Sequence, residues 1–164
     1  MSSTITATFK TRLAAENALA ELESIGITEE QISLVVTDET RGRSFNIDEG
    51  NKMDEGAAAG ATAGGIVGAI LGAVLAAGVV AIPGLNLVVA GSVISGLAGF
   101  GAGAATGGLL GGLIGAGIPE HEAKLYEGEV KKGAILLAVK TADHEQKKMV
   151  KDILHRVDAQ NIAA

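Results

Sequence analysis

Three histidines are the first residues in the chain that could bind a metal or support catalysis. His121 and Glu122 begin like the zinc-binding pattern HExxH, in which a second histidine lies one helical turn further on. Position 125 is leucine, so that second histidine is missing. His144 and His155 have no neighbouring nucleophile, and the chain contains no cysteine. The sequence therefore predicts no catalytic residue, no metal ligand and no enzyme activity.

Glycine-rich segments are the second candidate, because backbone N–H groups in glycine loops bind phosphates. Gly99, Gly101 and Gly103 resemble the start of a dinucleotide-binding loop, but position 104 is alanine and no acidic residue follows within reach of a ribose. The glycines at 107–112 are not followed by the lysine that a P-loop requires. No nucleotide or other cofactor is predicted.

The regular spacing of these glycines indicates helix packing and not phosphate binding. Residues 56–119 are 64 residues without a charged side chain, and they contain 19 of the 24 glycines. The first run is Gly56, Gly60, Gly64, Gly68 and Gly72, and the second is Gly91, Ser95, Gly99, Gly103, Gly107, Gly111 and Gly115. Four-residue spacing places each run on one helical face. Each glycine costs a helix about 1 kcal/mol relative to alanine, but the resulting groove lets a second backbone approach closely.

The two runs are symmetric about the point between Leu85 and Asn86. Folding the chain back there sets Gly56 through Gly72 opposite Gly115 through Gly99. Pro83 and Gly84, two typical turn residues, lie at this position. The sequence therefore predicts an antiparallel helical hairpin with arms near 57–82 and 86–117, in which the glycines mediate helix packing or oligomerisation.

Two environments remain open for such a hairpin. An arm of about 26 residues is ~39 Å long and could cross a ~30 Å hydrocarbon layer with tilt. Alternatively, hairpins from several copies could bury one another in a soluble oligomer, and no Trp or Tyr marks the ends of the arms as membrane-interface residues would. An apolar surface this large must be covered in either case. The expected partners are therefore other copies of the chain and, in the first case, membrane lipids.

Charge is confined to the rest of the chain. All 32 charged residues lie outside 56–119, and the net charge is −6, which argues against nucleic acid as a partner. The N-terminus has no apolar signal region. Basic residues flank the uncharged segment on both sides, at Arg41, Arg43, Lys52, Lys124, Lys131 and Lys132. For a membrane hairpin they favour a cytoplasmic polar domain with both termini cytoplasmic. A cytoplasmic, membrane-free protein is the alternative.

The polar part before the insert predicts a strand, a helix and a strand. Ile5, Ala7 and Phe9 alternate with threonines, which is typical of a half-buried strand. A helix is expected near 12–25, with Thr11 as N-cap and Gly26 as its end. Its expected apolar residues are Leu13, Leu19, Leu22 and Ile25. The second strand is expected at 31–37.

A second block of similar order follows the insert. A helix is expected from Pro119 to Lys132, ended by Gly133, with Leu125 and Val130 packed on the sheet. A central strand should follow at 134–140. Asp143 and Gln146 form a plausible capping pair for a last helix. Its expected inward residues are Met149, Val150, Ile153, Leu154 and Val157. A short final strand is expected at Asn161 and Ile162.

The resulting order, β-α-β, insert, β-α-β, predicts an α+β protein with a split ferredoxin-like domain and an inserted glycine-rich antiparallel helical hairpin. The expected organisation has three parts. Residues 1–37 plus 119–164 form the split domain, 38–55 form a charged linker, and 56–118 form the hairpin, hereafter the insert.

Taken together, these features resemble the bacterial general-stress, heat- or low-temperature-induced protein family. The resemblance covers nearly the whole chain and is most specific in the segment GIPEHEAKLYEGEVKKG at 117–133. It implies an association with stress and with membranes. It implies no catalytic residues that could be assigned to positions in this sequence.

Overall fold

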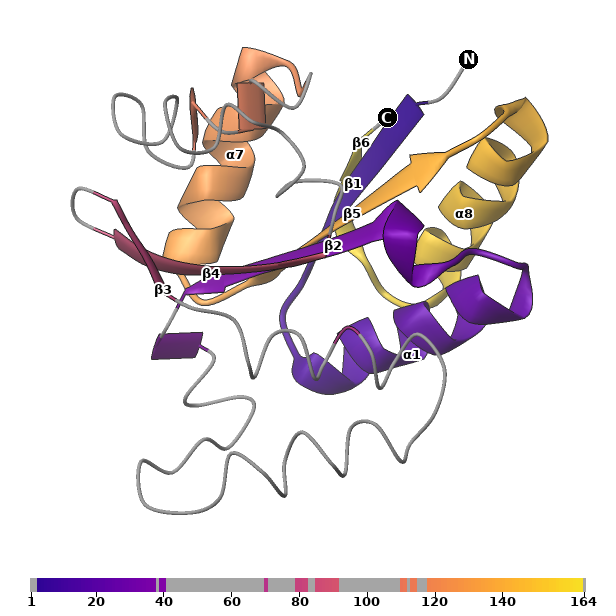
Figure 1. Ribbon diagram of the computed structural model, residues 1–164, viewed down its shortest axis with the longest axis horizontal. Coiled ribbons are helices and arrows are strands. Elements are labelled where there is room, and N and C mark those ends of the chain that lie inside the picture. Colours follow the sequence, from indigo (N-terminus) through magenta and orange to yellow (C-terminus); the bar gives the residue numbers. More distant parts are fainter. Residues whose placement is uncertain are drawn as a thin grey trace.

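The structure, a computed structural model, is an α+β arrangement with one antiparallel sheet (Figure 1). It describes residues 3–37, 39–40, 70, 79–82, 85–91, 110–111, 113–114 and 118–163, with the backbone alone for 79–82 and 85–91. The strands are β1 (Ser3–Phe9), β2 (Ile32–Thr37), β3 (Val79–Ile82), β4 (Leu85–Gly91), β5 (Ile135–Thr141) and β6 (Gln160–Ala163). The helices are α1 (Arg12–Ser24), α7 (Glu120–Lys131) and α8 (His144–Arg156), with a 3-10 turn η1 at Glu29–Gln31.

The strands are ordered β3-β4-β2-β5-β1-β6, and every neighbouring pair is antiparallel. Within this sheet, the strands contributed by the two polar blocks are β2-β5-β1-β6. Their order, together with α1 after β1 and α8 after β5, is compatible with a ferredoxin-like fold. The predicted α+β class and the predicted order of the polar elements are therefore confirmed.

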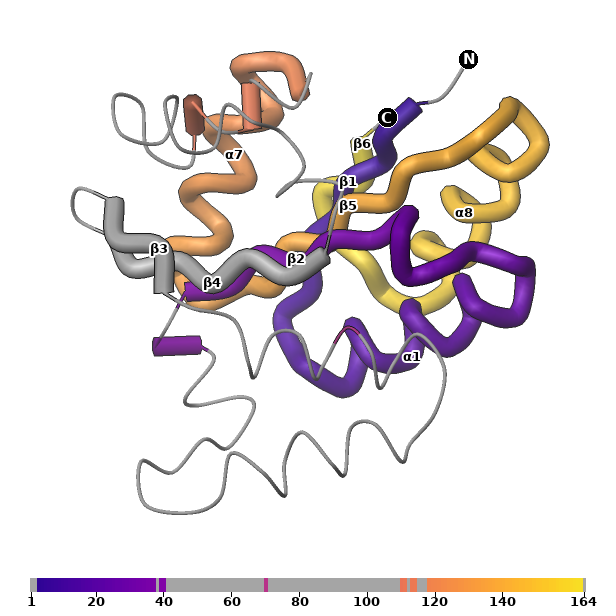
Figure 2. Tube along the Cα trace, in the orientation of Figure 1, coloured from indigo at the N-terminus to yellow at the C-terminus, as the bar shows by residue number. Residues whose placement is uncertain are grey.

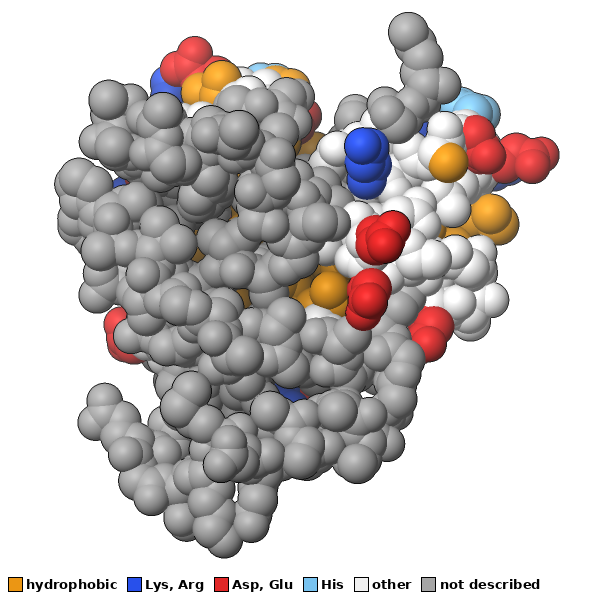
Figure 3. All heavy atoms as spheres, in the orientation of Figure 1, with side chains coloured by type: hydrophobic (Ala, Val, Ile, Leu, Met, Phe, Trp, Pro, Cys, Tyr) orange, Lys and Arg blue, Asp and Glu red, His pale blue; other side chains and the backbone are white. Residues whose placement is uncertain are grey.

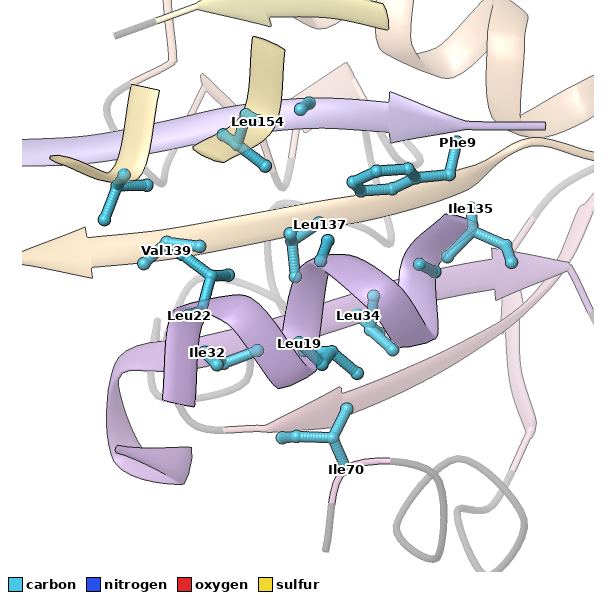
Figure 4. Packing of buried hydrophobic residues seen from close by; sticks show 14 of the residues in the cluster. Phe9, Leu19, Leu22, Ile32, Leu34, Ile70, Ile135, Leu137, Val139 and Leu154 are labelled. Atoms are coloured by element: carbon cyan, nitrogen blue, oxygen red, sulfur yellow. The ribbon is translucent and has the colours of Figure 1, made fainter. Parts of the chain in front are cut away.

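Alternation along the strands divides the buried residues between two faces. One face of the sheet carries Ile5, Ala7, Phe9, Ile32, Leu34, Val36, Ile135, Leu137 and Val139. These side chains pack with Leu19 and Leu22 of α1 and Leu154 of α8 in a single cluster, as Figure 4 shows. Period-two strands and a period-3.6 helical stripe thus meet in one core.

The other face of the sheet is covered by α7. In Figure 2 the trace of α7 lies on the opposite side of the strands from α1. Val35, Leu136 and Ala138 point to this face and are fully buried, as are Ala123, Tyr126 and Val130 of α7. Two of the three threonines of β1, Thr6 and Thr8, are therefore also buried, each 1% exposed, and Thr4 is half-buried. The prediction of a half-buried first strand was wrong, because Tyr126 of α7 lies against Thr6 and Asn161 contacts Thr8 from the paired strand β6.

The helix boundaries follow the expected capping residues. The Thr11 hydroxyl accepts a hydrogen bond from the Ala14 N–H at 3.2 Å, and the Asp143 carboxylate accepts one from the Gln146 N–H at 2.8 Å. Gly26 and Gly133 have φ of 85° and 102°, a conformation that favours glycine. The predicted start of α1 and the predicted cap of α8 at Asp143 are confirmed. Helix α1 ends one residue earlier than expected, at Ser24, and α7 is one residue shorter than expected at each end.

Three residues expected to face inward are exposed. Leu13 is 66% exposed, Leu125 46% and Met149 42%. In each helix the buried residues form a stripe beside the exposed residue. It comprises Ala15, Ala18, Leu19 and Leu22 in α1, Ala123, Tyr126 and Val130 in α7, and Val150, Ile153 and Leu154 in α8. The inward positions predicted for Leu19, Leu22, Val130, Val150, Ile153 and Leu154 are confirmed. In α1 and α7, alanines and Tyr126 complete the inward face, and a prediction from large aliphatic residues alone omitted them.

The helical arms predicted for the insert are wrong where the structure describes a continuous segment. Residues 79–82 and 86–91, expected in the two helices, lie in the strands β3 and β4. They pair with each other from Val79↔Val88 to Ile82↔Leu85. The chain therefore reverses between Ile82 and Leu85, and not between Leu85 and Asn86. A run of valines favours a strand over a helix once a partner strand is present, and β2 is that partner.

Candidate functional site

Most residues predicted to mediate helix packing lie outside the described part of the chain. These are Gly56, Gly60, Gly64, Gly68, Gly72, Gly99, Gly103, Gly107 and Gly115, together with the turn residues Pro83 and Gly84. Gly111 is described, and it is helical and half-buried. The structure therefore brings none of the predicted pairs together within its described residues. It shows instead where the insert meets the split domain.

The first point of contact is the pairing of β4 with β2. Five residue pairs align in register, from Ser33↔Gly91 to Thr37↔Leu87. On its other edge β2 pairs with β5, from Ile32↔Val139 to Val35↔Leu136. Through β4, a segment of the uncharged insert thus extends the sheet of the split domain. Sequence reasoning missed this contact because a strand partner outside the polar blocks was not considered.

The second point of contact is Ile70. It is helical, only 3% exposed, and belongs to the same core cluster as Leu19 and Leu34. Figure 4 shows Ile70 at the end of the cluster where these two side chains lie. A residue from the first glycine-rich run therefore contributes directly to the core between the sheet and α1.

The second half of the insert also has buried residues where it approaches α7 in the chain. Leu113 is fully buried and Ile118 is 6% exposed. The Ile118 N–H donates to the Leu113 carbonyl oxygen at 3.1 Å. Two apolar side chains just before α7 are therefore buried, whereas Ile114 between them is 43% exposed.

Tyr126 of α7 connects this helix to the opposite edge of the sheet. Its hydroxyl donates to the Asn161 carbonyl oxygen at 2.6 Å and accepts from the Thr6 hydroxyl at 2.8 Å. The Asn161 amide in turn donates to the Thr8 hydroxyl at 3.0 Å. Asn161 has φ of 52° and lies where the register between β1 and β6 shifts. The buried polar groups therefore hold the short strand β6 against β1.

The sequence contained a signal for Tyr126 that was not used. It is the chain's only tyrosine, and it lies three residues after Ala123 and four before Val130, on the buried stripe of α7. A buried tyrosine needs a hydrogen-bond partner for its hydroxyl, and the threonines of β1 supply one. Across the described residues, no buried side-chain nitrogen or oxygen lacks a partner. The arrangement is that of a structural tyrosine, whose hydroxyl is held by Thr6 and Asn161.

The ionisation of Tyr126 gives a testable consequence. Burial raises its pKa to about 12, the hydrogen bond from Thr6 opposes this shift, and the charge of Glu122 adds to it. An unfolded tyrosine titrates near pH 10. Because the folded pKa is the higher one, this contribution to stability is complete below pH 10 and is lost as the pH rises through about 12.

We therefore expect tyrosinate absorbance to appear in the native protein only near pH 12, about two units above that of the protein in denaturant. Since the chain has one tyrosine and no tryptophan, the signal comes from Tyr126 alone. Replacing Thr6 with valine removes the hydroxyl that stabilises the phenolate and should move the midpoint higher. A native midpoint near pH 10 would contradict the buried position of Tyr126.

The outer face of α7 is charged and mutually paired. The Lys124 ammonium lies 2.7 Å from the Glu120 carboxylate, and Lys131 lies 2.7 Å from Glu127. The hydrogen bond and charge of Lys124 lower the pKa of Glu120. On the face that Figure 3 shows, the described surface side chains include acidic, basic and hydrophobic ones, without one dominant kind. This surface is typical of a solvated exterior.

The candidate metal and membrane features have these outcomes. His121, His144 and His155 are all exposed. Among the residues that the structure describes, no cluster of three or more His, Cys, Asp or Glu side chains is arranged to hold a metal ion. Within the same residues, no helix has both the length and the apolar character needed to cross a membrane.

Comparison of the chain with protein-family models, with curated proteins and with solved structures finds no match.

Proposed function

We propose that this chain is a non-enzymatic, stress-associated protein that inserts its uncharged segment, 56–118, into a membrane and assembles there into a homo-oligomer. The observation that carries the proposal is the run of 64 residues without a charge, in which glycines recur every four residues. Membrane helices gain little from burying apolar side chains against each other, so they depend on the close approach that small residues permit. The resemblance to stress-induced proteins agrees with this role.

In the proposed membrane form, the insert is an antiparallel helical hairpin on a split ferredoxin-like domain. Its polar domain and both termini lie on the cytoplasmic side, where the flanking basic residues favour them. Lipids and other copies of the chain are the partners, and no nucleic acid or cofactor takes part. The charged exterior of the polar domain supports an aqueous location for that part.

A second candidate is favoured by a specific observation. The chain could be a soluble oligomeric scaffold or an apolar-ligand-binding protein whose inserts bury one another. The pairing of β4 with β2 and the burial of Ile70 support it, because they show parts of the insert covered by the split domain. In this case the protein would be cytoplasmic.

Extraction of the protein from cells distinguishes the two candidates. We expect the full-length chain to co-sediment with membranes, to resist washing with high salt and alkaline carbonate, and to need detergent for release. Salt disrupts surface electrostatic binding but leaves an apolar insertion intact. Recovery of a monodisperse, detergent-free soluble oligomer after these washes would favour the scaffold and reject membrane insertion.

A further inference from the structure

Two described segments of the insert contact the split domain, and these contacts have a regulatory consequence that rests on the proposed function. Strand β4 pairs with β2 along five residue pairs, and Ile70 lies in the core with Leu19 and Leu34. Both contacts use segments from within the uncharged stretch, at 70 and 85–91.

The pairing of β4 with β2 is incompatible with a bilayer interior. Lipid cannot hydrogen-bond backbone groups, so an open sheet edge does not occur within the hydrocarbon region. Among the described strands, β3 is the terminal one on the insert side of the sheet. If the insert enters a membrane, β3 and β4 must first leave β2, and Ile70 must leave the core.

The split domain can keep β2 in its sheet after this separation. On its other edge β2 keeps its pairing with β5, through four residue pairs. Residues Ile32, Leu34 and Val36 also remain in contact with the core cluster of α1, β1 and α8. Separation would therefore expose one edge of β2 without removing β2 from the sheet.

We infer that the pairing of β4 with β2, together with the burial of Ile70, is an autoinhibitory contact that holds the insert out of the membrane. In the closed form, the sheet covers part of the apolar segment and the protein remains in water. In the open form, the edge of β2 is free and the insert is available to lipid. The equilibrium between these forms sets how much protein binds a membrane.

A disulfide across the two strands tests the inference, because the chain contains no cysteine of its own. Two double variants place cysteines at paired positions, Val35→Cys with Val89→Cys and Leu34→Cys with Ala90→Cys. Adjacent pairs in an antiparallel ladder alternate between the wide and the narrow geometry, so one of the two has the closer spacing that suits a disulfide. A matched control, Thr4→Cys with Lys140→Cys, links β1 to β5, which stay together in both forms.

The readout is flotation with vesicles of phosphatidylglycerol and phosphatidylethanolamine, with and without reductant. We expect oxidation of a β2–β4 variant to lower the vesicle-bound fraction at least tenfold and reduction to restore it, while the control binds equally in both states. Equal binding of the oxidised and reduced forms would overturn the autoinhibitory contact and leave the proposed function intact. Failure of the wild-type chain and the reduced variants to bind would reject the proposed function itself. Failure of both adjacent pairs to form a disulfide in the vesicle-free protein would show that the closed pairing is absent.

Discussion

Replacing residues 54–117 with a flexible glycine-serine linker is expected to release the protein from membranes while leaving the split domain folded. The excision removes the whole uncharged stretch up to Ile118, so no apolar segment remains that could enter a bilayer. The remaining strands β2-β5-β1-β6 keep their mutual pairing, and closing a long loop with a shorter linker costs little. Membrane-bound protein should fall from most of the total to background.

The excised chain should nevertheless be less stable to unfolding than the full-length chain. It loses Ile70 from the core, and losing a buried isoleucine costs roughly 2–5 kcal/mol. It also leaves β2 with an unpaired edge, which favours association between copies. Circular dichroism, amide chemical-shift dispersion and urea denaturation would measure these effects. An unfolded product would mean that the insert is an integral part of the core, and continued membrane sedimentation would mean that another surface binds the bilayer.

The second large effect is expected from leucine substitutions in the glycine runs. If Gly68 and Gly103 lie where two helix backbones approach in the membrane form, Gly68→Leu or Gly103→Leu should force them apart. Overpacking of this kind costs about 1–3 kcal/mol, and about 2 kcal/mol corresponds to a roughly thirtyfold weaker assembly. Crosslinking yield and particle size in detergent would show the change.

Ala76→Leu is the control for these variants, because Ala76 follows Gly72 by four residues but is not a glycine and lies in the bulkier part of the arm, between Val74 and Val79. Ala90 is unsuitable as a second control, since it pairs with Leu34 in the β2–β4 ladder. Equal tolerance of leucine at Gly68, Gly103 and Ala76 would indicate that the spacing reflects composition alone. The oligomer built on glycine packing would then be wrong.

Local signals in the sequence were sufficient for most of the split domain. Alternation in β1, the N-caps Thr11 and Asp143, and the stops at Gly26 and Gly133 each depend on a few neighbouring residues. Such signals require no knowledge of distant contacts. The boundaries predicted from them therefore agree with the structure to within one or two residues.

The strands β3 and β4 could not be predicted in the same way. VVAI and LNLVVAG are short apolar runs, which periodicity cannot assign to a helix or a buried strand. A proline and a glycine between them are compatible with a turn in either structure. The choice between helix and strand is decided by the available edge of β2, nearly fifty residues earlier in the chain. The role of Tyr126 was missed for a related reason, since its partners Thr6 and Asn161 come from the two ends of the chain.

Lipid contact of the insert is the most direct test of the proposed function. The chain has no cysteine, so Ala76→Cys and Lys148→Cys each allow a single fluorescent label, one in the insert and one on the exposed surface of α8. With vesicles present, we predict that a quencher attached to lipid acyl chains reduces the emission of the label at position 76 and leaves that at 148 unchanged, while aqueous iodide does the reverse. If iodide quenches both labels equally and the lipid quencher affects neither, the insert does not enter the bilayer.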